Sequence, residues 1–257
     1  MTTKPIRYVP CFMKRLPTHQ WIEGVKQARA LDSRNAPASL VPESVPVAER
    51  ATLDIRTYWG KQGVDLSVGF LESATPALRA KILSHMNAWG EWANVRFRET
   101  TAAVGTADVR IAFGASGYWS YLGTDIRQIA AGEPTMNLQD FSLNTPDSEF
   151  YRVVRHETGH TLGFPHEHMR REIISLLDAE KTYAYFAKDQ GWSRDEVKAQ
   201  VLTPLEDKAM IETPADKISI MCYALPAEIT RNGVGIPGGL DIDPVDGKFA
   251  AKIYPKP

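Results

Sequence analysis

The sequence is poor in cysteine, carries almost no net charge and contains no long apolar run. Its 257 residues include two cysteines, Cys11 and Cys222, which are too few for a disulfide scaffold. They can form one bridge or remain two free thiols, and their spacing favours neither. The formal net charge of -1 argues against a nucleic acid or an anionic membrane recognised by bulk charge. No apolar stretch approaches the ~18 residues that a membrane-spanning helix requires.

The N-terminus also lacks the pattern of a secretory signal. Residues 1–10 contain no continuous apolar core of the ~7–15 residues that such signals have. A signal that was removed, export by another route and retention inside the cell all agree with this. We expect a monomer that is extracellular or translocated by another route rather than cytoplasmic.

The N-terminal part differs in composition from the rest of the chain. Residues 21–30 have the pattern of a short helix, and Pro37, Pro42 and Pro46 follow within ten residues. Prolines among small residues favour an extended linker. We therefore place a boundary near residue 48, between an N-terminal extension at 1–48 and a main domain at 49–257. The extension is a candidate pro-segment, and the main domain is long enough for a buried core.

The first half of the main domain has the pattern of a sheet with a helix packed on it. The helix is expected to begin at Thr75 and Pro76, which are a favoured N-cap and a favoured first-turn residue. The stretch 114–134 is predicted to be a long loop. Alternating apolar residues predict four short strands, at 66–70, 95–98, 109–113 and 135–138. The apolar face of the helix comprises Leu78, Ile82, Met86 and Trp89.

The second half is predicted to be mainly helical. Ser193 and Glu196 form a capping box, and Asp243 begins a last helix that ends near Tyr254. The fold class is therefore α+β, with a mixed sheet in an N-terminal lobe at about 49–166. A mainly helical lobe at about 167–257 follows, with the active-site cleft between the lobes. One further helix begins at Thr145 and Pro146, with Phe150, Val153, Val154 and Leu162 as its buried partners.

That helix carries the most informative motif of the chain. Residues 156–168 hold four of the six histidines and contain the pattern H-E-x-x-H-x-x-G-x-x-H. Two histidines four residues apart lie about one 5.4 Å turn apart on one helix face, so both can bind one metal. The fixed positions are His156, Glu157, His160, Gly163 and His166.

The spacing predicts one catalytic Zn2+ ion. Gly163 can adopt a positive φ and turn the chain sharply, which lets His166 supply a third ligand. Three protein ligands leave the fourth tetrahedral position open for water, as in catalytic zinc sites. Glu157 is not a ligand, and we expect it to act as general base on that water.

With these residues the chain resembles the metzincin metalloproteases, and among them the astacin family, especially disulfide-poor microbial members. The resemblance extends over roughly 50–255. A second motif supports it, because Ser219-Ile220-Met221-Cys222-Tyr223 matches the Met-turn of the family. Trp119-Ser120 and the strand at 135–138 support it more loosely.

The resemblance implies roles for residues outside the histidine motif. Met221 would pack beneath the zinc ligands, and Tyr223 would stabilise the oxyanion and act as a candidate fifth zinc ligand. Glu167 matches a residue that receives the processed N-terminus in mature members. The chain departs from the family after Arg170, where the final Arg-Asp of the family pattern is absent, so fine specificity is not implied.

Several residues near the motif have two readings. His168 is expected to be a solvated side chain or one that supports the ligands, rather than a fourth ligand. Phe164 and the run at 118–121 would line the cleft or belong to the core. The strand at 135–138 is the candidate sheet edge on which an extended peptide adds as a further strand, or an ordinary edge strand.

The N-terminal segment offers two candidates for a latency device. Some metzincins are kept inactive by a cysteine thiolate at the open zinc position, and Cys11 is the one cysteine before the linker. The usual residues around such a cysteine are absent. Astacins use an aspartate for this purpose, for which Asp32 is a candidate.

Three functions agree with the sequence. The first is a zinc-dependent endopeptidase acting on peptide or protein substrates. The second is a zinc hydrolase of a non-peptide amide substrate, because activated water attacks amides generally. The third is a silent binding module with a structural zinc, which Glu157 disfavours because it would have no structural task there.

Overall fold

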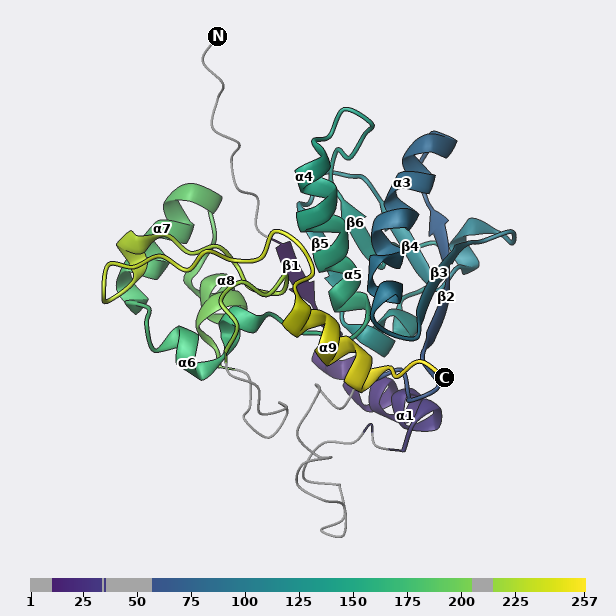
Figure 1. Cartoon of the computed structure of the whole chain (residues 1–257), viewed down its shortest axis with the longest axis horizontal. Helices are drawn as coiled ribbons and strands as arrows, with labels where there is room; N and C mark the ends of the chain where they lie inside the picture. The colour runs from purple at the N-terminus through teal and green to yellow at the C-terminus, as the bar shows by residue number, and fades with distance from the viewer. Residues whose placement is uncertain (1–10, 34, 36–56, 205–214) are drawn as a thin grey trace.

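The computed structural model describes residues 11–33, 35, 57–204 and 215–257 (Figure 1). The predicted boundary near residue 48 and the proline-rich linker lie outside these residues. Both cysteines are buried free thiols. Among the described residues, no helix is long and apolar enough to cross a membrane.

A six-stranded mixed sheet forms the centre of the larger lobe (Figure 1). Its strands are β1 (Cys11–Lys14), β2 (Val64–Phe70), β3 (Val95–Glu99), β4 (Val109–Ala112), β5 (Tyr118–Tyr121) and β6 (Met136–Leu138). They lie in the order β1-β5-β6-β4-β2-β3. The pair β1 and β5 is parallel within itself and antiparallel to the other four strands.

The prediction of a free sheet edge at residues 135–138 is wrong, because β6 lies inside the sheet between β5 and β4. β5, which the sequence placed in a long loop, lies beyond β6, and β1 covers its outer edge. The alternation that marks a half-buried strand is missing from β5 because the neighbouring Trp119 and Ser120 are both buried. The four predicted strands themselves are confirmed.

The predicted helix on the sheet is confirmed as α3 (Pro76–Met86). Its N-cap is Thr75, whose Oγ1 accepts a hydrogen bond from the Leu78 N–H at 3.2 Å. The apolar face is buried as predicted, and it continues into a 3-10 turn (Asn87–Glu91) that buries Trp89. Trp89 Nε1 donates to the Arg155 carbonyl at 2.9 Å, which links this layer to the helix that carries the histidines.

We call residues 147–161 the histidine helix. It consists of α4 (Asp147–Glu149), a π-helical turn (Phe150–Val154) and α5 (Arg155–Thr161). Such π-bulges occur often at functional sites. Three hydrogen bonds hold its C-terminal end. The hydroxyl groups of Ser120 and Thr161 are hydrogen-bonded at 3.0 Å, and Trp59 Nε1 donates to the Thr161 carbonyl at 2.8 Å. The Tyr254 hydroxyl donates to the Leu162 carbonyl at 2.6 Å.

Helices dominate the chain between His166 and residue 202, as predicted, whereas the single helical element in the described stretch 215–243 is one 3-10 turn. They are α6 (Arg171–Ile174), α7 (Ala179–Gln190), α8 (Arg194–Val197) and a π-helical turn (Lys198–Leu202). α6, α7 and α8 lie together beside the sheet (Figure 1). The predicted capping box at Ser193 and the last helix, α9 (Pro244–Ile253), are both present. One buried apolar cluster extends through both lobes.

The N-terminal segment belongs to the same body. After β1 comes a 3-10 turn (Thr18–Gln20) and then α1 (Trp21–Leu31), which confirms the predicted helix. The remaining short 3-10 turns are Val104–Thr106, Gly123–Gln128, Glu167–Met169 and Ala227–Ile229.

Candidate active site

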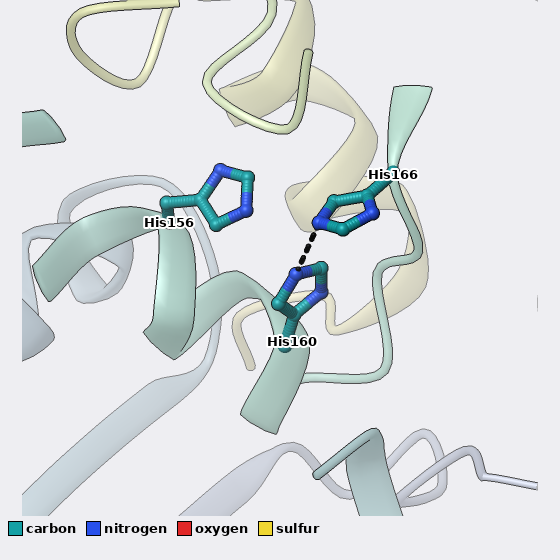
Figure 2. A group of neighbouring side chains, drawn as sticks. All are labelled: His156, His160 and His166. Carbon is teal, nitrogen blue, oxygen red and sulfur yellow. Dashed lines mark hydrogen bonds between the residues drawn. The ribbon is translucent and has the colours of Figure 1, made fainter. Parts of the chain in front are cut away.

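Three histidine rings face one another beside the end of the histidine helix (Figure 2). His156 and His160 stand on α5, and His166 follows the turn at Gly163, which has a φ of +94°. One ring nitrogen of each histidine lies within 4.8 Å of the others. The turn thus brings together the three side chains that the spacing grouped.

Hydrogen bonds decide which nitrogen of two of these rings faces the centre. His156 Nδ1 lies 2.6 Å from the Ile220 carbonyl oxygen, and His160 Nδ1 lies 2.7 Å from that of Phe164. A carbonyl oxygen only accepts, so each Nδ1 carries the proton and each Nε2 presents a lone pair. His160 Nε2 is 2.9 Å from His166 Nε2. His156 Nε2 is buried with no hydrogen-bond partner in the described part of the chain.

These residues fit a zinc ion. Burial lowers the pKa of His156 to about 4 and those of His160 and His166 well below their usual value, so all three imidazoles are neutral at pH 7, as metal binding requires. Tetrahedral Zn–N bonds of about 2.0–2.1 Å separate the ligand nitrogens by about 3.4 Å. The distances here, from 2.9 to at most 4.8 Å, span that value. A cation would also satisfy the buried His156 Nε2, whose desolvation otherwise costs about 1–3 kcal/mol.

Glu157 lies beside the histidines with its carboxyl group fully buried. The Cys11 thiol approaches this carboxyl group as a hydrogen-bond donor. Burial raises its pKa to about 8, against the smaller lowering effects of the nearby Cys11 thiol and the Arg152 guanidinium. A cation held by the neighbouring imidazoles would favour the carboxylate and lower this pKa.

Tyr223 is fully buried beside two of the three histidines. Its ring centroid is 4.5 Å from that of His166 and 6.4 Å from that of His156. The segment before it is anchored to α9, because Ser219 Oγ and the Ile220 N–H both donate to the Asp246 carboxylate, at 2.6 and 2.8 Å. Asp246 carries no sequence signal for this role.

Met221 packs directly against the histidine helix. Its sulfur atom occupies the space that a Cβ atom at Gly159 would need. The zinc motif leaves position 159 unspecified, so the pattern by itself does not point to this contact. A glycine inside a helix costs about 1 kcal/mol relative to alanine, and that cost is the signal that could have identified it.

Cys11 is brought into the site by β1. One ligand-type atom each from Cys11, His156 and Glu157 lie within 4.8 Å of one another. The thiol is buried, and burial raises its pKa well above the usual value. Asp32 instead caps the end of α1 beside Gly60 and joins neither group of potential metal ligands found among the described residues.

The remaining candidate residues either belong to the apolar core or make hydrogen bonds around the site. Phe164 is buried against the rings of Trp89 and Phe249, so it belongs to the core. Glu167 Oε1 accepts from the Asp216 N–H at 3.0 Å and from Arg170 Nη1 at 3.3 Å. His168 is fully buried, which rules out a solvated side chain, and it is not part of the three-histidine group.

Comparison with known proteins identifies a family for this arrangement. Residues 52–226 match the model of the Astacin peptidase family. Zinc metalloproteinase nas-27 of Caenorhabditis elegans is 33% identical over 128 residues, which are 47% of this chain. The match covers 27% of that relative, so the chain spans about a quarter of its length.

Solved structures agree with the fold. A structure of myroilysin has a TM-score of 0.74 and 32% identity, over 80% of this chain and 99% of that one. High choriolytic enzyme 1, a hatching enzyme zinc-protease from Oryzias latipes, has a TM-score of 0.53 and 19% identity, over 78% and 96%. The second likeness concerns the fold alone.

Proposed function

We propose that this chain, which belongs to the astacin family, is a zinc-dependent endopeptidase with His156, His160 and His166 as its zinc ligands. The observation that carries the proposal is the pairing of two unusual features. Three buried neutral imidazoles surround one point, and a fully buried carboxyl group, which the Cys11 thiol approaches, stands next to it.

Two residues would perform the proton transfer and the charge stabilisation. A bound zinc ion supplies a Lewis acid that lowers the pKa of water and polarises a carbonyl group. Glu157 takes a proton from the attacking water at one carboxylate oxygen and later delivers it to the leaving amine nitrogen. The Tyr223 ring lies nearer to the His166 ring than to the His156 ring, and its hydroxyl would donate a hydrogen bond to the developing oxyanion.

A peptide is the substrate that the surroundings favour. β5 lies next to the site, and its outer edge pairs with an extended segment of the chain, namely β1. An extended peptide substrate can use the same backbone groups once that edge is free. The strand proposed to bind the substrate is therefore residues 118–121 and not residues 135–138, which the sequence predicted.

We further propose that β1 keeps the full chain latent. The Cys11 sulfur lies within 4.8 Å of potential ligand atoms of His156 and Glu157, and its thiolate is a zinc ligand that would fill the place of the attacking water. The following residues hold the strand in place. Phe12 packs on Trp192 with ring centroids 4.8 Å apart, and Lys14 Nζ lies 3.3 Å from the centroid of the Trp119 ring.

One digest tests both proposals. A diverse peptide mixture is incubated with the zinc-loaded full chain, with Cys11→Ser and with the double variant Cys11→Ser, Glu157→Gln, and the products are identified by mass spectrometry. We expect Cys11→Ser to cleave faster than wild type because the water position is open. We expect Glu157→Gln, combined with Cys11→Ser, to lose about 10²–10⁴-fold in rate because the base is gone.

The control is Ile22→Ser, which makes a similar substitution at an exposed side chain of α1 and should behave as wild type. Equal activity of wild type and Cys11→Ser would refute latency through the thiol. Bound zinc without peptide cleavage in any variant would favour the amide hydrolase alternative.

A further inference from the structure

His168 is a buried histidine that the proposed chemistry does not use. It follows the third zinc-ligand candidate by two residues, within the short turn Glu167–Met169, and its side chain is fully buried. Each of its two ring nitrogens is hydrogen-bonded to a backbone group, which holds for none of the three ligand candidates. The two backbone groups come from distant segments of the chain.

The two partners define the tautomer of His168. Its Nδ1 accepts a hydrogen bond from the backbone N–H of Tyr223 at 3.3 Å, so Nδ1 carries no proton. Its Nε2 therefore carries the proton and donates it to the Gln200 carbonyl at 2.9 Å. The ring is thus tied at one end to the backbone of Tyr223 and at the other to the turn after α8.

The face of the same ring lies against the side chain of Tyr223. The two rings are stacked, with centroids 3.9 Å apart and planes inclined by 24°. His166 also contacts the His168 ring, but at a centroid distance of 4.8 Å. Backbone and side chain of Tyr223 are therefore both in contact with one anchored imidazole.

We propose that His168 is the positioning residue of Tyr223. Its ring is fixed by two hydrogen bonds and stacks on the phenol ring, which keeps the phenol beside the proposed zinc ligands. The inference rests on the proposed role of Tyr223 in stabilising the oxyanion. Donors aimed at a developing charge help only if they are oriented beforehand. A tyrosine next to three ligand imidazoles gains that orientation from the stack and from the hydrogen bond to its own backbone.

A merely structural histidine would behave differently from a positioning residue. Loss of a structural residue lowers stability and would reduce the rate to the same extent whether or not the Tyr223 hydroxyl is present. Loss of a positioning residue lowers kcat with little change in KM, because the oxyanion exists only in the transition state. The loss also disappears when the hydroxyl is already removed.

The kinetic test is a double-mutant cycle in whichever full-length protein, wild type or Cys11→Ser, cleaves peptides faster. His168→Asn keeps an acceptor near the Nδ1 position but removes the ring, and His168→Phe keeps the ring but removes both hydrogen bonds. We expect His168→Asn to lower kcat about 10-fold and to change it less than about 2-fold in the Tyr223→Phe background. His168→Phe should lie between His168→Asn and the parent.

A second measurement does not depend on activity. NMR spectra of the zinc-free protein with 13C-labelled tyrosine report the ring of Tyr223, which Tyr223→Phe identifies. We expect His168→Asn to change its shifts and to speed its ring flips, while tyrosines far from the site keep their signals. Zinc affinity, measured by chelator competition, should be unchanged.

The outcomes separate the two proposals. Equal loss of kcat in both backgrounds, or an unaltered Tyr223 signal in His168→Asn, overturns the positioning role. If Tyr223→Phe leaves kcat unchanged, the proposed role of the hydroxyl fails, and the NMR measurement alone decides whether His168 positions the ring.

Discussion

At the scale of single residues, the contact between Gly159 and Met221 shows how closely the Met-turn approaches the histidine helix. The sulfur atom lies where any side chain at Gly159 would begin, between the two ligands on α5. A methionine can fill such an irregular space because its side chain is unbranched and flexible. The approach of the two segments brings Tyr223 near the ligands.

Two effects oppose each other when Gly159 is replaced by alanine. Helix propensity favours alanine by about 1 kcal/mol, whereas the clash with Met221 costs about 1–3 kcal/mol. Because Met221 is buried and Trp89 also lies against this position, we expect the clash to prevail and Gly159→Ala to be destabilising. Urea unfolding of the zinc-free protein measures the difference.

The matched control is Gly24→Ala in α1, where the nearest obstacle is the end of the Leu16 side chain. That substitution should be neutral or stabilising. A stability of Gly159→Ala equal to or above wild type would show that Met221 moves aside without cost.

At the scale of elements, the edge of β5 is the feature that joins substrate binding to latency. Its partner β1 contributes four residues only, and a strand of that length is held mainly by its side chains. Phe12 lies between Trp192 and the backbone at Gly117. The Met13 carbonyl accepts a hydrogen bond from Gln200 Nε2 at 3.3 Å.

Removing the Phe12 ring should therefore loosen β1. An aromatic contact of this kind contributes about 0.5–1.5 kcal/mol beyond its area, so we expect Phe12→Ala to raise the opening of β1 and the peptidase rate of the full chain about 3–10-fold. Hydrogen exchange of the β1 and β5 amides measures the opening of β1, and the peptide digest measures the peptidase rate. Ile22→Ala, at an exposed position of the same segment, is the control, and unchanged exchange in Phe12→Ala would contradict the argument.

At the scale of the whole molecule, four buried histidines make folding sensitive to acid. Burial lowers the pKa of His156 to about 4 and that of His168 to about 3, and it lowers those of His160 and His166 well below normal. In the unfolded chain each would titrate near 6.5. Below that pH the unfolded state binds more protons, so folded-state stability falls as pH falls.

The buried Glu157 carboxyl, whose pKa is raised to about 8, acts in the opposite direction between about pH 4.5 and 8. The histidine contribution is therefore measured in the zinc-free protein as the difference in unfolding free energy between wild type and His156→Gln, which should shrink as pH falls from about 6.5 to 4. The contribution of His156 alone is of the order of 3 kcal/mol at pH 4. His19→Gln, at an exposed side chain, should differ from wild type by the same amount across this range. A difference between wild type and His156→Gln that stays constant from pH 7 to 4 would show that His156 is protonated without cost.

Much of this architecture could be predicted from local pattern. Strands β2, β3 and β4, the caps at Thr75 and Ser193, and the turn at Gly163 follow from rules that act within a few residues of the chain. The same holds for the proposed zinc ligands, because helical spacing places His156 and His160 on one face. Membership of the astacin family followed from two short motifs.

Other features were decided only by the tertiary structure. The position of β6 inside the sheet and the identity of β5 as the strand paired with β1 depend on which strands pair, and pairing is a long-range choice that local alternation does not encode. His168 is buried beneath Tyr223, which lies 55 positions further along the chain. Cys11 approaches Glu157, which lies about 146 positions further along. Local sequence therefore determined the grouping of the three proposed zinc ligands, whereas packing between distant segments determined what surrounds them, because burial and contact arise only when those segments meet.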